Sequence, residues 1–260
     1  MSTSEHVLVV RDGAILWITI NRPQALNALN PLVHRELSSA LDSFADDAAL
    51  RVAVITGAGE RAFCVGSDLK ARATINADDH PPTGFGGISH RFDLAKPVIA
   101  AVNGLALGGG VEIVATCDLA IAADHVEFGL PEPRVGLAAL GGGGLQRLAR
   151  HLPLKYAMEL VLTGRRFGAE EAKRIGLIND VVPRAELKAR VRGMAGMIIE
   201  GAPLAVEASK QVMLQSLAIP DLQTAFRAKY PAAERMLASE DAKEGQRAFV
   251  EKRKPRWQGK

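Results

Sequence analysis

A run of glycines and two glutamates are the residues whose types and spacing point most directly to chemistry. Ala106-Leu107-Gly108-Gly109-Gly110-Val111-Glu112 leads into a predicted helix, and Phe128-Gly129-Leu130-Pro131-Glu132 follows twenty residues later. Glycines at a helix start let a ligand approach bare backbone N–H groups at the positive end of the helix dipole, as in an oxyanion site. Glu112 would lie in an apolar stretch, where a carboxylate is costly. The two glutamates could therefore act as an acid/base pair. Two alternatives to this role remain open. Glu112 could compensate the dipole at the start of the helix, and Glu132 could be a carboxylate on a surface loop.

A second glycine motif points to different chemistry. Gly57-Ala58-Gly59-Glu60-Arg61-Ala62 follows a predicted strand and fits the GxGxxA fingerprint of dinucleotide-binding enzymes. However, Gly66 falls where the following helix should run, and no strand ending in an acidic residue occurs about twenty positions on. A nicotinamide or flavin site is therefore the less favoured interpretation.

A third group of polar residues lies in the long irregular segment 72–92. It contains Asp78, Asp79, His80 and His90, whose oxygen and imidazole groups could bind a metal. Their spacing matches no metal site that we can name, so a solvated loop is the favoured interpretation. Loops of about twenty residues within a domain are usually functional or mobile.

The elements that must position these residues begin with a hairpin and a helix. Strands over residues 7–10 and 14–20 flank Asp12-Gly13, which predicts a β-hairpin with a type I′ turn. Asn30-Pro31 then supplies a helix cap and a first-turn proline before apolar residues that share one helical face.

Three short apolar runs, at residues 52–56, 98–102 and 119–123, read as buried strands. A segment of helical length after Gly110 separates the last two. Strand, helix and strand at this spacing predict an α/β fold with a mainly parallel, helix-covered sheet.

Beyond Pro183 the sequence becomes helical, and Pro203 and Pro220 separate its segments. We expect a core over residues 1–183 and a helical region over residues 184–260. The predicted helices are residues 185–200, 203–217, 222–237 and 241–252. Their apolar faces could pack on the core or form a subunit interface.

Composition excludes several classes of protein. The chain has 260 residues, 48% of them hydrophobic and 23% charged, which indicates a globular protein. A net charge of +3 argues against a dedicated nucleic-acid binder. The apolar stretch 98–115 contains Asn103 and Glu112, so we expect no membrane span. Only Cys64 and Cys117 are present, and no signal peptide is evident. We expect a cytoplasmic protein.

Twelve ordered stretches along nearly the whole chain match one family pattern. They include Gly66-Ser67-Asp68-Leu69-Lys70 and both glutamate motifs. The full set is residues 21–23, 25–29, 56–59, 62–64, 66–70, 96–104, 106–112, 117–118, 128–132, 162–165, 170–172 and 176–177. In these stretches the chain resembles the crotonase superfamily, specifically the enoyl-CoA hydratase family.

The resemblance implies a crotonase (ClpP-like) fold, a superhelix of repeated ββα units with a C-terminal helical trimerisation region. It also implies an acyl-CoA substrate, a trimer or dimer of trimers, and no metal or redox cofactor. Backbone N–H groups of Ser67 and Gly109 would form the oxyanion hole, and Glu112 and Glu132 would be catalytic. Contacts to substrate and coenzyme A would fall on Ala25, Ala62, Cys64, Ser67, Asp68, Leu69, Lys70, Leu105, Gly108 and Gly109.

Two positions depart from the family pattern. Ser67 stands where alanine is usual, although only its backbone N–H is required. Residues 136–147 carry one additional glycine and lack the usual proline and threonine, in a segment that lies near the acyl pocket of the family. Residues 84–91 and Ala138-Ala139-Leu140 are similar to carnitinyl-type and actinobacterial hydratase-like members.

The activity that the resemblance favours is syn-type addition of water to a trans-2-enoyl-CoA, giving a 3-hydroxyacyl-CoA. The alternatives within the superfamily are a Δ3–Δ2 enoyl-CoA isomerase, a carnitinyl-type dehydratase and an aromatic acyl-CoA hydratase/lyase. Isomerase branches commonly lack the carboxylate at position 112, so the glutamate pair favours hydration. The alternative from another class is a non-catalytic RNA-binding protein, which the glutamate pair and the near-neutral charge disfavour.

Overall fold

A six-stranded sheet forms the centre of the computed structural model, which describes residues 5–69 and 80–260. Its order is β1-β2-β3-β5-β7-β10, and every neighbouring pair is parallel except the β1-β2 hairpin. The strands are β1 (Val7–Asp12), β2 (Ile15–Ile20), β3 (Val52–Gly57), β5 (Val98–Val102), β7 (Leu119–Ala123) and β10 (Asp180–Val182). The three predicted buried strands and the mainly parallel sheet are confirmed.

A second sheet of four short strands lies beside the first, in the order β4-β6-β8-β9. The strands are β4 (Ala62–Cys64), β6 (Leu105–Leu107), β8 (Glu127–Gly129) and β9 (Arg166–Gly168). From β3 to β8 the chain contributes strands to the large and the small sheet in turn. This alternation winds the backbone into the expected superhelix.

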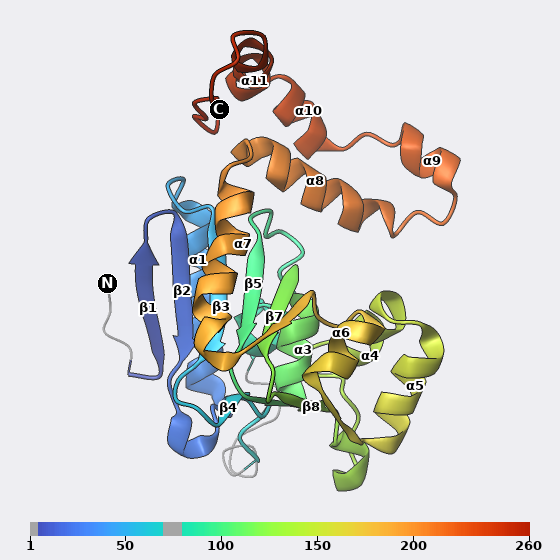
Figure 1. Ribbon diagram of the computed structural model, residues 1–260. Helices are drawn as coiled ribbons and strands as arrows, with labels where there is room; N and C mark the ends of the chain where they lie inside the picture. The colour runs from blue at the N-terminus through green and yellow to red at the C-terminus, as the bar shows by residue number, and fades with distance from the viewer. Residues whose placement is uncertain (1–4, 70–79) are drawn as a thin grey trace.

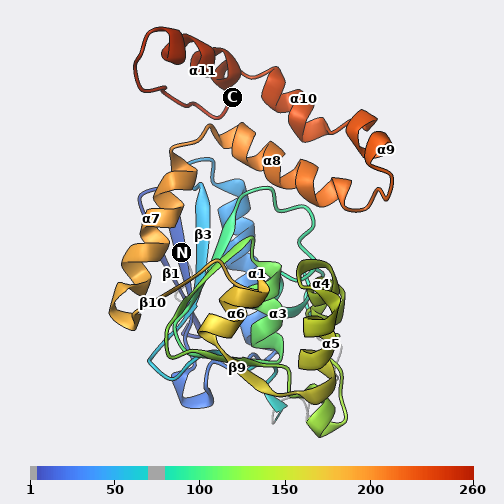
Figure 2. The same cartoon turned by 45° about the vertical axis from the view of Figure 1, so that its right-hand side comes forward.

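Helices cover both faces of the large sheet (Figures 1 and 2). α7 (Leu187–Ile199) lies across one face, and α1 (Pro31–Asp46) and α3 (Gly109–Thr116) lie on the other. α1 begins as predicted, because the Asn30 side chain accepts a hydrogen bond from the Val33 N–H at 3.0 Å and Pro31 occupies the first turn.

The remaining elements of the core lie mostly between β8 and β10. They are α4 (Gly144–His151), α5 (Leu154–Thr163) and α6 (Ala169–Ile175), with the short 3₁₀ helices η1 (Pro23–Ala25), η2 (Phe85–Gly87), η3 (Glu132–Val135) and η4 (Arg184–Glu186). All three residues of η2 are buried, so this part of the predicted irregular loop is packed. Glycine is required in it, because a Cβ on Gly87 would collide with the backbone of Ser38 on α1.

Four helices form a layer above the core (Figure 1). They are α8 (Pro203–Ser216), α9 (Leu222–Arg227), α10 (Pro231–Leu237) and α11 (Glu240–Val250). The continuous helix predicted over residues 222–237 is wrong, because the chain breaks between α9 and α10. Pro231 disfavours helical geometry at the preceding Tyr230, which is extended. The division of the chain at residue 183 stays a prediction.

Two further expectations are corrected by the backbone. The hairpin loop is Gly13-Ala14, and only Gly13 has a positive φ, whereas a type I′ turn needs positive φ at both central residues. The GxGxxA motif runs from β3 into β4 and not into a helix. Without a helix N-terminus the motif lacks the element that binds a dinucleotide phosphate, so that interpretation is wrong.

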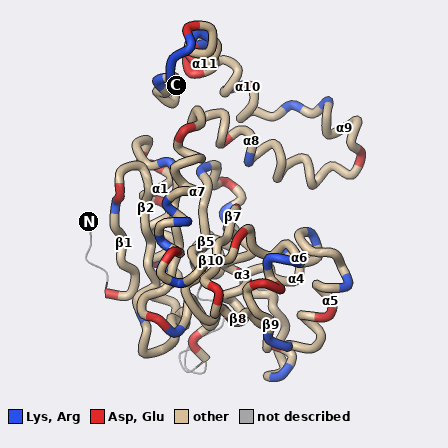
Figure 3. The backbone as a smooth tube through the Cα atoms, in the orientation of Figure 1, with Lys and Arg blue, Asp and Glu red and all other residues tan. Residues whose placement is uncertain are grey.

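Lysines and arginines are interspersed with acidic residues along helices such as α1, α6 and α11 (Figure 3). Among the described residues, no helix has both the length and the apolar character needed to cross a bilayer.

Candidate active site

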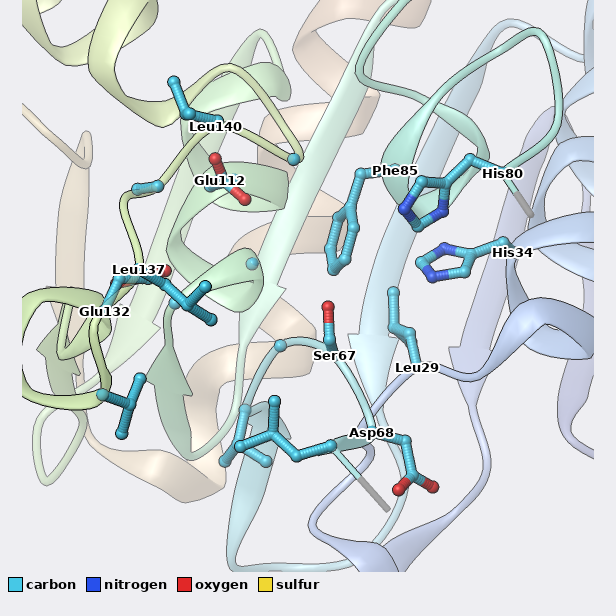
Figure 4. Close-up of a pocket in the computed structure, with 18 of the residues that line it drawn as sticks. Leu29, His34, Ser67, Asp68, His80, Phe85, Glu112, Glu132, Leu137 and Leu140 are labelled. Carbon is cyan, nitrogen blue, oxygen red and sulfur yellow. The ribbon is translucent and has the colours of Figure 1, made fainter. Parts of the chain in front are cut away.

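A cavity of about 420 Å³ brings together the residues singled out by the sequence. Glu112, Glu132, Ser67 and Gly109 all line it. It lies between the first turn of α1, the start of α3 and residues 131–141. In Figure 4 the two glutamates form one wall, and Phe85, His34 and His80 stand on the opposite side.

The backbone places Ser67 so that its N–H is not used by its neighbouring strand. Leu29 donates to the Gly66 carbonyl and accepts from the Asp68 N–H, both at 2.8 Å. In a parallel bridge of this kind the N–H of the middle residue, Ser67, points away from Leu29. Arg22 holds the segment in place through an ion pair with Asp68 at 2.9 Å.

Gly109 supplies the second N–H of the predicted oxyanion hole. It is the first residue of α3, so its N–H is one of the four that have no acceptor within the helix. The Ser67 segment runs close to it, since a Cβ on Gly66 would lie 2.9 Å from the Gly109 nitrogen. Gly109 itself has no room for a side chain, because a Cβ would collide with the Phe85 ring. The two donors therefore line the same small space.

Glu112 lies in the first turn of α3 and is 3% exposed. Its Oε1 accepts a hydrogen bond from the Gly144 N–H at 2.8 Å, where α4 begins. The glycines of this segment make the approach possible. A Cβ on Gly142 would lie 2.6 Å from the Glu112 Cβ, and a Cβ on Gly144 would lie 3.0 Å from its Cγ. The additional glycine therefore belongs to a segment that shapes the site of Glu112.

Glu132 begins η3 and is only half-buried as a residue, but its carboxylate is enclosed. Its Oε2 is buried and has no hydrogen-bond partner in the described part of the chain. Oε1 lies over Gly108, where a Cβ would be 2.8 Å away. Glu132 is thus an enclosed catalytic candidate, not a surface carboxylate.

Burial raises the pKa of both carboxyl groups, but their surroundings differ. For Glu112, hydrogen bonds from the Gly144 and Gly142 N–H groups and the positive charge of Arg147 oppose this rise in pKa. For Glu132, a hydrogen bond from its own N–H opposes the rise, whereas the negative charge of Glu112 adds to it. The surroundings therefore favour the charge on Glu112 and the proton on Glu132.

An aromatic cluster forms the opposite wall of the cavity. The His34 and Phe85 rings meet edge to face with centroids 4.7 Å apart, and the His80 ring lies 4.5 Å from that of His34. Nδ1 of buried His34 accepts a hydrogen bond from the Gly86 N–H at 2.9 Å. This bond holds η2 against α1 and places Phe85 beside Gly109.

Of the predicted substrate contacts, only some line this cavity. The five that line it are Ser67, Asp68, Leu69, Gly108 and Gly109. Ala62 and Cys64 are buried on β4, and Ala25 on η1 and Leu105 on β6 are half-buried outside it. Lys70 lies outside the described residues. The contacts of all ten residues with the substrate or its coenzyme A group stay predictions.

The metal interpretation gains no support from the part that the structure describes. Within residues 5–69 and 80–260, no three His, Cys, Asp or Glu side chains come together as a metal site. Asp78 and Asp79 lie outside this part.

Sequence reasoning missed the residues that hold the glutamates and close the cavity. These are Gly142, Gly144, Arg147, Phe85 and His34. The glycine run before α4 was the one available signal, because successive glycines indicate close backbone approach.

Comparison with known proteins finds relatives over nearly the whole chain. A sequence model of the family described as enoyl-CoA hydratase/isomerase matches residues 11–260. A protein of Escherichia coli strain K12 named carnitinyl-CoA dehydratase is 44% identical over 266 residues, which cover 99% of this chain and 100% of that protein.

Solved structures match the whole fold. A crystal structure of an enoyl-CoA hydratase from Mycobacterium tuberculosis has a TM-score of 0.92 and 42% identity, covering 99% of this chain and 100% of that one. An enoyl-CoA hydratase structure from Bacillus anthracis has a TM-score of 0.90 and 37% identity, covering 98% of this chain and 100% of that one. These matches confirm the predicted fold class, whereas a role of the C-terminal helices in trimerisation stays a prediction.

Proposed function

The chain belongs to the enoyl-CoA hydratase/isomerase family, and we propose that it reversibly adds water to a trans-2-enoyl-CoA to give a 3-hydroxyacyl-CoA. The observation that carries this proposal is that Glu112, Glu132, Ser67 and Gly109 line one cavity. Two carboxyl groups and two backbone donors are what the addition of water to an activated double bond requires.

The thioester oxygen accepts hydrogen bonds from the N–H groups of Ser67 and Gly109. As water adds to C3, negative charge develops on this oxygen, and the two donors stabilise the enolate-like state. Removing one donor of this kind typically raises the barrier by ~3–4 kcal/mol.

The two glutamates divide the proton transfers. Glu112 accepts a proton from the attacking water, and Glu132 donates a proton to C2. The support for this order is electrostatic: backbone donors and Arg147 stabilise charge on Glu112, whereas Glu112 disfavours charge on Glu132. Each positioned acid or base contributes roughly 10²–10⁴-fold to the rate. In the reverse direction the two groups exchange roles.

Dehydration of a carnitinyl thioester is the second candidate, since the relatives named carnitinyl-CoA dehydratase are 44% identical to this chain. The reaction type is the reverse of hydration and needs the same four groups. The two candidates differ in the acyl group. In both, coenzyme A enters as part of the substrate, and we propose no metal or redox cofactor.

The test is an assay of crotonyl-CoA, longer 2-enoyl-CoA thioesters and carnitinyl-CoA, with the enoyl thioester absorbance as the readout. We expect loss of absorbance with the enoyl substrates and formation of the 3-hydroxyacyl product. A purified, folded protein that hydrates no enoyl-CoA and dehydrates no 3-hydroxyacyl-CoA would refute the proposal.

We also propose that the chain assembles as a trimer or a dimer of trimers. Large apolar side chains are exposed on α8 and α9, among them Met213 at 70%, Leu222 at 81% and Phe226 at 89%. Such surfaces usually mark contacts with another protein chain. Light scattering that finds a monomer at micromolar concentration would refute this.

We propose a cytoplasmic location as well. It is supported by Cys64 and Cys117, which are both buried and form no disulfide.

A further inference from the structure

A cavity of about 660 Å³ lies under α7, on the face of the large sheet that is opposite to α1 and α3. α7 and η4 form one side of it, and β1, β2, β3 and β5 form the other (Figure 1). None of the described residues that line it also lines the catalytic cavity. A ligand of this cavity would therefore be separate from the acyl-CoA substrate.

The floor of the cavity under α7 is made by side chains on one face of neighbouring strands. Thr19 on β2 lies opposite Thr56 on β3, and Thr56 lies opposite Ala101 on β5. Trp17 comes two residues before Thr19, so it points to the same face, and Val10 lies opposite it on β1. The Thr56 hydroxyl donates to the Ala101 carbonyl at 2.8 Å. The floor is therefore mainly apolar, with the indole as its largest group.

Trp17 contributes a hydrogen-bond donor that the protein itself does not use. The residue lines the cavity and is only 9% exposed, and its Nε1 is buried without an acceptor among the described residues. Buried donors nearly always have a partner, because an unpaired one loses its hydration without compensation. An indole N–H can only donate. The partner that this group lacks is therefore an acceptor atom.

Cationic side chains line the cavity, and one of them has no carboxylate partner. Arg11, Arg184 and Arg192 each form an ion pair with an acidic residue, at distances between 2.5 and 3.0 Å. Lys188 on α7 is exposed and forms no ion pair with any residue that the structure describes. Its Nζ lies 5.6 Å from the centre of the Trp17 ring. One uncompensated positive charge therefore lies beside the unused indole N–H.

We propose that this cavity binds a small organic monocarboxylate with an apolar body. The exposed Lys188 side chain moves aside, and the carboxylate accepts hydrogen bonds from Trp17 Nε1 and from the Lys188 ammonium. The apolar body lies between the floor and buried Leu187. The inference does not depend on the proposed hydration reaction.

Charge and size favour a monocarboxylate over an inorganic anion. The three arginines are already neutralised by their own partners, so the cavity offers one free positive charge and one neutral donor. A phosphate dianion would remain partly uncompensated there. A cavity of about 660 Å³ is also within the range of sites for organic ligands and has more room than an inorganic ion needs.

The two tryptophans of the chain provide a direct test. Trp257→Phe leaves Trp17 as the only tryptophan, so the indole emission of this full-length variant reports on the cavity. Phenylacetate is titrated into it, with phenylacetamide as the neutral analogue of the same shape and inorganic phosphate as the ion without a body. We expect a saturable change with phenylacetate and none with the other two at the same concentrations.

Three results of this titration would overturn the proposal. The first is no saturable response to phenylacetate. The second is an equal response to phenylacetamide, which would show an apolar pocket without a role for the charge. The third is an equal response to phosphate, which would show a general anion site.

Two variants test the two groups that hold the carboxylate, with binding measured by calorimetry. Trp17→Phe removes the buried donor to a charged acceptor and should raise the Kd of phenylacetate about tenfold or more. Lys188→Met removes an exposed charge, which contributes less, and should raise the Kd about threefold. The matched control is Lys155→Met, an exposed position on α5 outside the cavity lining, which should leave the Kd unchanged.

Lys188→Met keeps the test decisive if the buried Trp17→Phe substitution disturbs folding, because Lys188 is exposed. An unchanged Kd in the folded variants overturns the proposal. An equal rise in Lys155→Met would show unspecific attraction by charge and also overturns it. If phenylacetate does not bind and Lys188→Met lowers the molar mass by light scattering, the cavity is a contact between copies of the chain, which again overturns the proposal.

Discussion

Glu112 Oε1 accepts a hydrogen bond from the backbone N–H of Gly144 at 2.8 Å, which joins the first turn of α3 to the first residue of α4. The proposed base is therefore fixed by a segment that lies after Glu132 in the sequence. The glycines of this segment allow the contact, because side chains at residues 142 and 144 would occupy the space of Glu112.

Gly142→Ala should lower kcat by displacing the base. The new Cβ would lie 2.6 Å from the Glu112 Cβ and 3.0 Å from its carboxyl carbon, so the glutamate has to move. A shift of about 1 Å at a reacting group can cost about 10²-fold in rate. Hydration kinetics of the purified variant provide the measurement.

The matched control for this variant is Gly193→Ala on α7, where a Cβ meets no atom within 4 Å. It should keep wild-type turnover. If Gly142→Ala also keeps wild-type turnover, close packing on Glu112 does not control the base.

Removing the charge of Arg147 should shift the pH profile of hydration. Arg147 donates to the Ser89 carbonyl at 2.7 Å, and its positive charge lowers the pKa of Glu112. Arg147→Met should therefore raise that pKa. Because the base must be ionised, the rate is lost as the pH falls through its pKa, and this acidic limb should move to higher pH.

Arg147→Lys keeps the charge and should shift the limb less. Glu132 also faces the cavity, as do His34 and His80 on the opposite wall, and all three are unchanged in both variants. An acidic limb of kcat/KM at the same pH in wild type and Arg147→Met would contradict the electrostatic role. A general loss of rate at all pH values would indicate a structural role only.

Gly193→Ala should also stabilise the fold. Gly193 lies within α7 at an exposed position, and alanine there meets no neighbouring atom. Glycine in a helix interior costs roughly 0.5–1 kcal/mol relative to alanine. Denaturant unfolding should show an increase of that size in the free energy of unfolding, and a decrease would show that the glycine has another task.

Much of the fold could be predicted because its signals are local. Buried strands such as residues 98–102 are short apolar runs, and Asn30-Pro31 caps α1 by its own side chain and ring. The break at Pro231 also has a local cause, but the apolar spacing on both sides of it resembles that of one helix. The hairpin turn was misassigned because the loop is shifted by one residue, to Gly13-Ala14.

The site was predictable only in part. Glu112, Glu132 and the helix start at Gly109 are visible as residue types in a pattern. The contacts of Gly144 with Glu112 and of Phe85 with Gly109 join segments far apart in the sequence, and no local pattern encodes them. The close approach of Phe85 to Gly109 also limits which variants can test the site. Gly109→Pro is not a clean way to remove the N–H, because its ring would collide with Phe85.

The central claim is that Glu112 and Glu132 act together on one water. Glutamine keeps the size and hydrogen bonding of glutamate but cannot exchange the proton. The most direct measurement compares hydration and double-bond migration by wild type, Glu112→Gln, Glu132→Gln and the double variant.

The account predicts that each single variant loses at least ~10²-fold in hydration. The double variant should lose less than the product of the two, because groups that act as a unit are not additive. An isomerase would need only one carboxylate, and would depend on Glu132 while tolerating Glu112→Gln. Near-full hydration by Glu112→Gln would contradict the two-glutamate mechanism, and accompanying double-bond migration would assign the chain to the isomerase.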